Sequence, residues 1–180
     1  MTAIKSIGEV EDLMINTPNF VAVDTGVSAD YSTTRPYVKV AGGHINCFTY
    51  GVHLQNAPQS SISDLLIYKF QDTVNDTVAV VFDSCDDSSV KNMALINQAS
   101  DATTDGQWNG IIVTNSVRCT IDDIRHTAPS KTDILSGTTT LTRTSRIKPE
   151  GSYLNATVQT YDDAFFRYQR VFWRQQDDHQ

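Results

Sequence analysis

Apolar residues in the middle of the chain recur in a fixed order along three stretches. Residues 51–68, 79–96 and 110–127 align without a gap over eighteen positions. The shared apolar columns are Val52, Val80 and Ile111; Leu54, Phe82 and Val113; Ile62, Val90 and Ile121; and Leu65, Met93 and Ile124. Self-similarity at a near-constant interval is typical of repeat architectures, in which each unit packs on its neighbours.

The spacing inside each row predicts two short strands joined by a polar bend. Val52 and Leu54 are two residues apart, which places both on one face of a strand. The step from Ile62 to Leu65 is three, as expected where a strand turns a corner before it resumes. One row alone leaves its apolar face uncovered, so the rows must stack. We therefore predict an all-β fold, a short right-handed parallel β-helix over residues 37–133, with partial rows upstream at 37–40 and 44–48.

The segment before the repeat is predicted to be a cap. Ser6 and Glu9 have the form of a capping box, and Val10, Leu13 and Met14 can turn toward a core. These residues predict a short helix over 6–14, within an N-terminal capping segment at 1–36.

The segment after the repeat, residues 134–180, is predicted to be a hairpin followed by an oligomerisation or docking tail. The residue pattern from Gly137 onward predicts a β-hairpin, with Pro149 in the turn that joins its two strands. Residues 162–173 predict a helix, with a strand as the alternative. On a helix, one face is apolar, a second is basic and a third is aromatic. These faces are Ala164, Phe165, Tyr168, Val171 and Phe172; Arg167, Arg170 and Arg174; and Phe166 and Trp173.

Length, charge and cysteine content limit the classes of function. A chain of 180 residues fits about one domain, and a net charge of −7 argues against nucleic acid as the main partner. No stretch has the apolar length of a membrane span, and no signal peptide is recognised, so we expect synthesis and folding in a cytoplasm. Cys47, Cys85 and Cys119 lack zinc-site spacing and are expected to be reduced thiols. We expect no metal, cofactor or membrane partner.

The repeat resembles a known family. Its order of glycine, spaced apolar residues, a polar bend and the pattern I-x-x-L-x-I is similar to the pectate-lyase-like parallel β-helix, especially the version in bacteriophage tailspikes. The resemblance covers about residues 6–127. The glycine-rich stretch common after the first helix is replaced by "DTGVSADYSTTRP", and the solenoid is shorter than in polysaccharide-degrading spikes. The resemblance implies a homotrimer in a virion, in contact with other virion proteins.

Five aspartates are candidate carbohydrate contacts. Asp83, Asp86 and Asp87 cluster at one polar bend, and Asp122 and Asp123 are neighbours in the next row. Carboxyl groups beside a sugar groove bind or cleave glycans, whereas a solvated acidic bend is the structural alternative for the cluster. No set of residues is predicted to be catalytic, because neither a nucleophile elbow nor a phosphate loop occurs.

A second polar column contains Asp64, Asn92 and Asp123. Such columns often form ladders of hydrogen-bonded side chains. Two coils separate Asp64 from Asp123, or roughly 10 Å, which is slightly too far for a catalytic carboxylate pair.

An outward column is a candidate subunit interface. His53, Val81 and Ile112 lie between the two inward columns of one strand, and two of them are apolar where solvent favours polar groups. Either a connector covers this column or a neighbouring subunit packs on it. The tail residues predicted to join such an interface are Phe165, Tyr168, Phe172 and Trp173.

Three functions follow as hypotheses. The leading one is a non-enzymatic structural protein of a bacteriophage particle: a short trimeric spike, fibre or capsid-decoration module. The alternative is a tailspike-type receptor-binding protein that binds or depolymerises bacterial surface polysaccharide. A stand-alone polysaccharide lyase or hydrolase is the third, and it would need more coils to form a groove.

Overall fold

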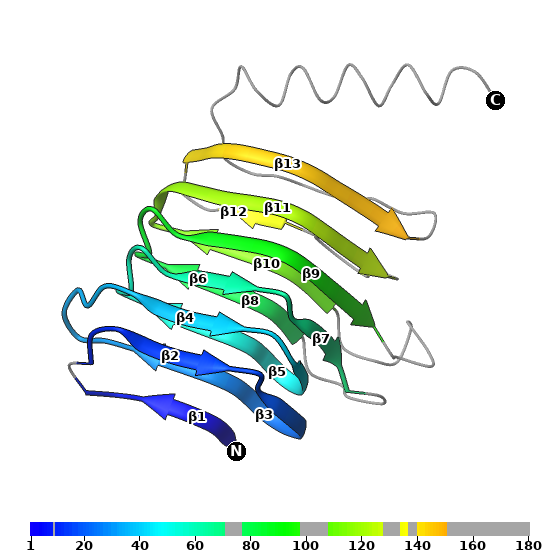
Figure 1. Cartoon of the computed structure of the whole chain (residues 1–180), viewed down its shortest axis with the longest axis horizontal. Coiled ribbons are helices and arrows are strands. Elements are labelled where there is room, and N and C mark those ends of the chain that lie inside the picture. The colour runs from blue at the N-terminus through cyan, green and yellow to red at the C-terminus, as the bar shows by residue number, and fades with distance from the viewer. Residues whose placement is uncertain (9, 71–76, 98–107, 128–133, 137–139, 151–180) are drawn as a thin grey trace.

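The chain forms a parallel β-solenoid. The computed structural model describes residues 1–8, 10–70, 77–97, 108–127, 134–136 and 140–150. In these residues, thirteen strands belong to one hydrogen-bonded network, and every ladder in it is parallel. Figure 1 shows the coils rising from the N-terminal strands at the bottom to β13 (Thr140–Glu150) near the top.

Each coil has three sides, which we call faces A, B and C in chain order. Face A contains β1 (Thr2–Ser6), the ends of β3 (Asn19–Asp30) and β5 (His44–Gln55), β8 (Thr77–Asp83), β10 (Trp108–Thr114) and β12 (Ile134–Ser136). Face B contains β2 (Leu13–Asn16), β4 (Val38–Ala41), β6 (Ser61–Ser63) and the starts of β9 (Ser89–Asn97), β11 (Val117–Thr127) and β13. Face C contains the starts of β3 and β5, β7 (Leu66–Lys69) and the ends of β9, β11 and β13.

The register confirms the predicted columns. Val52 is paired with Val80, and Val80 with Ile111, on face A. Ile62, Val90 and Ile121 are stacked in the same way on face B. The partial rows at 37–40 and 44–48 prove to be sides B and C of a single coil, because they pair with β6 and β7 respectively. The repeated row therefore has three strands and two corners. The prediction of two strands around one bend is wrong, because the left-handed backbone at Asp64 separates Ser61–Ser63 from Leu66–Lys69.

Residues in the left-handed region of backbone space form the corners. Between faces B and C, Gly42, Asp64, Asn92 and Asp123 share one column and have φ of 70°, 59°, 49° and 51°. Between faces A and B, Asn56, Ser84 and Asn115 do the same, with φ of 54°, 57° and 50°. Glycine, asparagine and aspartate tolerate this conformation better than other residues, which explains why the bends are polar.

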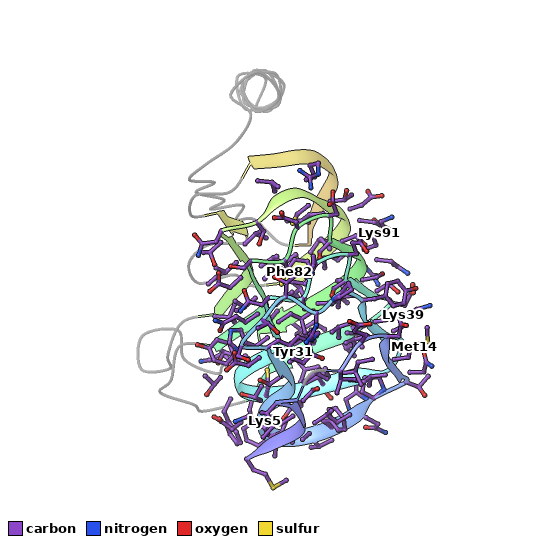
Figure 2. All side chains as sticks on the ribbon, turned by 90° about the vertical axis from the view of Figure 1, so that its left-hand side faces the viewer. Lys5, Met14, Tyr31, Lys39, Phe82 and Lys91 are labelled. Atoms are coloured by element: carbon purple, nitrogen blue, oxygen red, sulfur yellow. The ribbon has the colours of Figure 1, made fainter. Side chains whose placement is uncertain are left out.

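Among the described residues, the core is a column of stacked aliphatic side chains that also contains the rings of Tyr31 and Phe82. Leu54, Phe82 and Val113 follow one another on face A and are fully buried. Figure 2 shows Phe82 between the ribbons, whereas Lys39 and Lys91 of face B point away from them. Lys69 is an exception that the sequence analysis missed, because its inward side chain is fully buried on face C.

The helix predicted over 6–14 is not found among the described residues. Ser6 ends β1, Leu13 begins β2, and Glu9 lies outside the description. Leu13 and Ile15 alternate toward the core and pair with Val38 and Val40 of the next coil. Strand pairing with the neighbouring coil thus overrides a local pattern that also suits a helix. The stacked strands begin at Thr2, within the segment expected to be a cap.

The predicted C-terminal hairpin is only partly described. Its first arm is β13, which pairs in parallel with β11. The turn predicted at Pro149 is wrong, because Pro149 lies in β13 opposite His126, where pairing with the previous coil continues. The solenoid ladder therefore extends to Glu150. The remainder of the hairpin and the tail, including Phe165, Tyr168, Phe172 and Trp173, lie outside the described residues.

Candidate functional site

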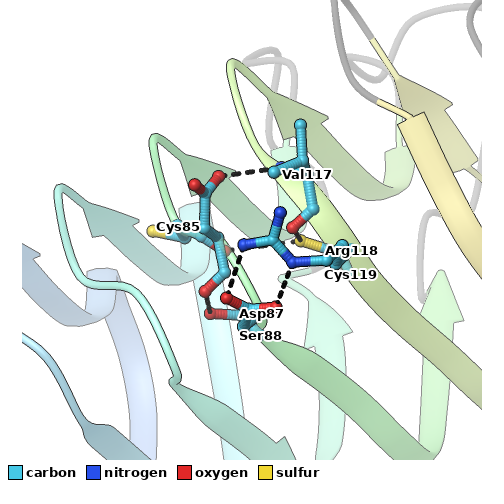
Figure 3. A network of polar contacts seen from close by, with 7 residues as sticks. Cys85, Asp87, Ser88, Val117, Arg118 and Cys119 are labelled. Carbon is cyan, nitrogen blue, oxygen red and sulfur yellow. Dashed lines mark hydrogen bonds and ion pairs between the residues drawn. The ribbon is translucent and has the colours of Figure 1, made fainter.

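The acidic bend between faces A and B uses its carboxylates to join one coil to the next. Asp86 Oδ1 accepts a hydrogen bond from the Val117 backbone N–H at 2.9 Å. Asp83 Oδ1 accepts hydrogen bonds from Asn115 Nδ2 at 2.9 Å and from Ser84 Oγ at 3.2 Å. Figure 3 shows part of this bend, with the side chains directed across the gap between two coils. These hydrogen bonds join the acidic bend of one coil to the bend of the next.

The third carboxylate of the bend has a cationic partner. Arg118 Nε and an Nη donate to the two oxygens of Asp87 at 2.6 and 2.7 Å (Figure 3). These bonds lower the pKa of the Asp87 carboxyl and raise the pKa of the Arg118 guanidinium. The pair is solvent-exposed, with side-chain exposures of 42% for Asp87 and 57% for Arg118, so it contributes little to stability.

Buried serines complete the inner side of the same bend. Ser60 Oγ accepts from the Val38 N–H at 3.0 Å, and Ser88 Oγ accepts from the Ser60 N–H at 2.9 Å. Ser116 Oγ likewise accepts from the Cys85 N–H at 2.8 Å. These hydroxyls satisfy backbone donors that the corner takes out of the strand ladders, which is what burial requires. Their place in the aligned rows, directly before or after the bend, was the signal available in the sequence.

The corner between faces B and C carries the predicted ladder. Asn92 Nδ2 donates to Asp64 Oδ1 at 2.6 Å, one coil apart. Hydrogen bonds from Ser63 and Asn92 lower the pKa of Asp64. Asp123 takes the corner position of the next coil, and Asp122 stands outward on face B opposite Lys91. The two neighbouring aspartates therefore lie on different parts of the coil.

A shallow hollow of about 210 Å³ lies beside this corner. Its lining spans four coils and combines polar groups with apolar ones. The lining residues are Gly43, Asp64, Leu65, Leu66, Asn92, Ala94 and Arg125. On the adjoining face C, the rings of His44 and Tyr68 are stacked, with centroids 5.8 Å apart and planes 9° from parallel. Polar planar side chains beside aromatic rings are compatible with a carbohydrate, although neither Asp122 nor Asp123 lines the hollow.

The three cysteines are free and buried. Burial raises the pKa of Cys47 and of Cys85 to about 12 and that of Cys119 to about 11. Cys119 Sγ donates to the Cys85 backbone oxygen at 3.4 Å. A thiol with such a pKa is a poor nucleophile at neutral pH, so these residues act as small packed side chains.

The outward column of face A lies as the alignment predicts. His53 is paired with Val81, and Val81 with Ile112, and all three side chains are partly exposed. Burial lowers the pKa of His53, against the opposing effect of Asp30 and Asp83. The His53 ring also stacks on Tyr50, with centroids 5.1 Å apart.

The five predicted aspartates are thus not gathered into one site. Asp83, Asp86 and Asp87 belong to the bend between faces A and B, whereas Asp122 and Asp123 are on face B and its far corner. In the part of the chain that the structure describes, no group of three histidine, cysteine, aspartate or glutamate residues could hold a metal ion. The same described residues contain no helix long and apolar enough to cross a bilayer.

Comparison with known proteins adds no relative. Neither a family model nor a curated protein nor a solved structure matches the chain.

Proposed function

We propose that the chain is a non-enzymatic structural module of a bacteriophage particle, built on a right-handed β-helix of the tailspike type. The observation that carries this proposal is that the carboxylates of the acidic bend between faces A and B form hydrogen bonds between coils. Asp83, Asp86 and Asp87 each bind a group of the next coil, which supports a role of the acidic bend in joining the coils. The resemblance of the repeat to virion spikes is the reason for proposing a bacteriophage particle.

The module is proposed to act as a homotrimer in contact with other virion proteins. Face A carries the apolar outward side chains Val81 and Ile112, which suit packing against a neighbour. Sedimentation velocity of the 180-residue protein at micromolar concentration tests the subunit count. A stable monomer over that range contradicts the trimer.

Two assays test the structural role itself. The protein is expected to copurify with assembled particles, as judged by mass spectrometry of particles banded in a density gradient. It is also expected to release neither reducing ends nor unsaturated sugars from bacterial capsule. Sugar release that persists in Asp83→Asn and Asp87→Asn variants would contradict the structural role and would also exclude those carboxylates.

A receptor-binding role is the second candidate, because of the hollow beside the corner between faces B and C. Asp64, Asn92 and Arg125 line it, and the His44–Tyr68 stack adjoins it. Glycan-array binding that is lost in Asn92→Ala and kept in Lys91→Ala would support this role. Binding that both variants retain would place the glycan elsewhere.

A further inference from the structure

The outward surface of face A combines apolar side chains with carboxylates. His53, Val81 and Ile112 follow one another in one outward column, and all three are partly exposed. Two residues further along its strand than Val81, Asp83 stands in the next outward column, and Asp30 takes the same position two coils earlier. Both carboxylates act on the imidazole of His53, so they lie beside the apolar column. A partner that fits this surface has apolar side chains next to a cation.

The outward surface of face C has those properties. Leu66, Tyr68, Ala94 and Ile96 form two neighbouring columns in β7 and β9. Each of them is partly exposed, whereas the residues between them are fully buried. In the next coil Arg125 continues the column of Leu66 and Ala94, and it is exposed. A guanidinium has five N–H donors, so Arg125 can bind a carboxylate of a partner and keep the interactions that it has within the chain.

We propose that face A of one copy of this chain packs against face C of a second copy, with the two solenoid axes parallel. The inference rests on the proposed homotrimer and names the two surfaces that meet in it. Because these surfaces differ, the contact is heterologous, and a heterologous contact forms a ring when its rotation closes. Three copies closed in this way cover the apolar side chains of both faces in every subunit.

The order of residues along the axis favours this pairing. Rotation about an axis parallel to the solenoid leaves the height of each coil unchanged, so a strand of face A meets the face C strand of the same turn. Val81 in β8 and Ala94 in β9 belong to one turn and therefore face each other across the contact. Asp83 belongs to that turn as well, and Arg125 is one coil further, about 4.8 Å along the axis. An arginine side chain is long enough to cover that step.

The hollow beside the corner between faces B and C has room for a side chain of face A. Leu65, Leu66 and Ala94 form its apolar wall, and Arg125 also lines it. Because Val81 lies in the same turn as Ala94, its side chain is the one that enters the hollow of about 210 Å³. A hollow filled in this way excludes a glycan from the assembled protein.

Disulfide cross-linking of the full chain tests the contact. We expect Val81→Cys/Ala94→Cys, oxidised in a glutathione disulfide buffer, to give covalent oligomers up to the trimer on a non-reducing gel. Neither Val81→Cys nor Ala94→Cys alone is expected to give them, because each position faces the other and not its own equivalent. Within one chain the two positions lie on different sides of the solenoid, so the bond has to join two copies. The native thiols are buried and do not compete.

A matched control moves the second thiol to another face. In Val81→Cys/Lys91→Cys the second thiol is on the exposed outward side of face B, and this variant is expected to stay monomeric on the gel. Arg125→Gln is expected to weaken association severalfold in sedimentation velocity at low salt. For the wild type, 0.5 M salt is expected to act in the same direction. Far-UV circular dichroism checks that each variant keeps the fold.

Three results would overturn the inference. They are the absence of cross-links in Val81→Cys/Ala94→Cys, equal cross-linking in the Val81→Cys/Lys91→Cys control, and association that Arg125→Gln leaves unchanged. Cross-links in Val81→Cys alone would overturn it too, because two copies of face A would then meet. A trimer in sedimentation without the expected cross-link contradicts the assigned faces alone, whereas a wild-type monomer contradicts the trimer as well. The structural role in a particle is judged separately, by mass spectrometry of banded particles.

Discussion

Arg118 and Asp87 occupy the same position of the bend in successive coils, and two hydrogen bonds of 2.6 and 2.7 Å join them. Both residues also have a left-handed backbone, with φ of 58° each. A guanidinium is thus placed over a carboxylate by the repeat itself, because equivalent corner residues must stack. The relationship shows how the bends combine a strained backbone with a favourable contact between coils.

The Asp87–Arg118 pair is predicted to contribute to stability in a manner that depends on pH and salt. Because Arg118 lowers the pKa of Asp87 in the folded state, this contribution is present above the unfolded pKa of about 4 and is lost as the pH falls through the folded pKa. Urea unfolding of wild type, Asp87→Asn, Arg118→Gln and the double variant should give a small coupling at pH 7. The coupling should shrink at 0.5 M salt, because the pair is exposed. A coupling of equal size at pH 2 and pH 7 would contradict the assignment.

At the corner between faces B and C, we predict that the stability of the fold depends on the backbone conformation of Asn92 as well as on its side-chain hydrogen bond. Asn92 has φ of 49° and an exposed side chain, so Asn92→Val should destabilise the fold by about 1–2 kcal/mol through backbone strain. Asn92→Gly removes the same hydrogen bond to Asp64 without that strain, so it should cost less. Chemical denaturation measures both. Lys91→Val is the control, since Lys91 is exposed on the extended backbone of the same strand. Equal losses for Asn92→Val and Asn92→Gly would show that the side-chain contact, and not φ, matters here.

At Gly51 the backbones of two coils approach closely, so we predict that adding a side chain there destabilises the protein. A Cβ there would lie 2.5 Å from the Ala79 carbonyl oxygen and 2.7 Å from Ile67 Cγ2. Gly51→Ala is therefore expected to destabilise the protein by about 1–3 kcal/mol, because a backbone atom has to move. Gly8→Ala is the control, since nothing lies within 4 Å of a Cβ at Gly8. The melting temperature of Gly51→Ala should be clearly lower than that of Gly8→Ala. Equal melting temperatures would mean that the backbone at Gly51 can shift at little cost in free energy.

The inward columns could be predicted from sequence because they depend on local alternation. Val52 and Leu54 are two residues apart and therefore share one face of their strand. Because the coils stack in register, the equivalent residues of the next coil face inward as well. The corners were harder, because the bends vary in sequence and share only backbone conformation. Nothing in a single row indicates that Arg118 lies over Asp87, or that Lys69 is buried, until the coil height and corner positions are known.

The first coil could not be predicted for a related reason. Val10, Leu13 and Met14 have the spacing of one helical face, and Ser6 with Glu9 suits a cap. In the structure Val10 and Met14 are 39% and 56% exposed, and the inward residues are Leu13 and Ile15. Only the pairing with Val38 and Val40 selects the strand, and that pairing joins residues twenty-five positions apart.

The buried thiols predict a loss of stability at alkaline pH. Burial raises the pKa of Cys47 and Cys85 to about 12 and of Cys119 to about 11, whereas an unfolded thiol titrates near 8.5. The stability that these neutral thiols provide is complete below the unfolded pKa and is lost as the pH rises toward the folded pKa. The free energy of unfolding should therefore fall between about pH 9 and pH 11, by up to about 1.4 kcal/mol per pH unit for each thiol. Cys85→Ala is the informative variant, because Ala57 fills the same column one coil earlier. It should fold, with a shallower alkaline slope than wild type. Rapid modification of all three thiols in the native protein at pH 8 would contradict their burial, and an unchanged slope would assign the alkaline loss to other groups.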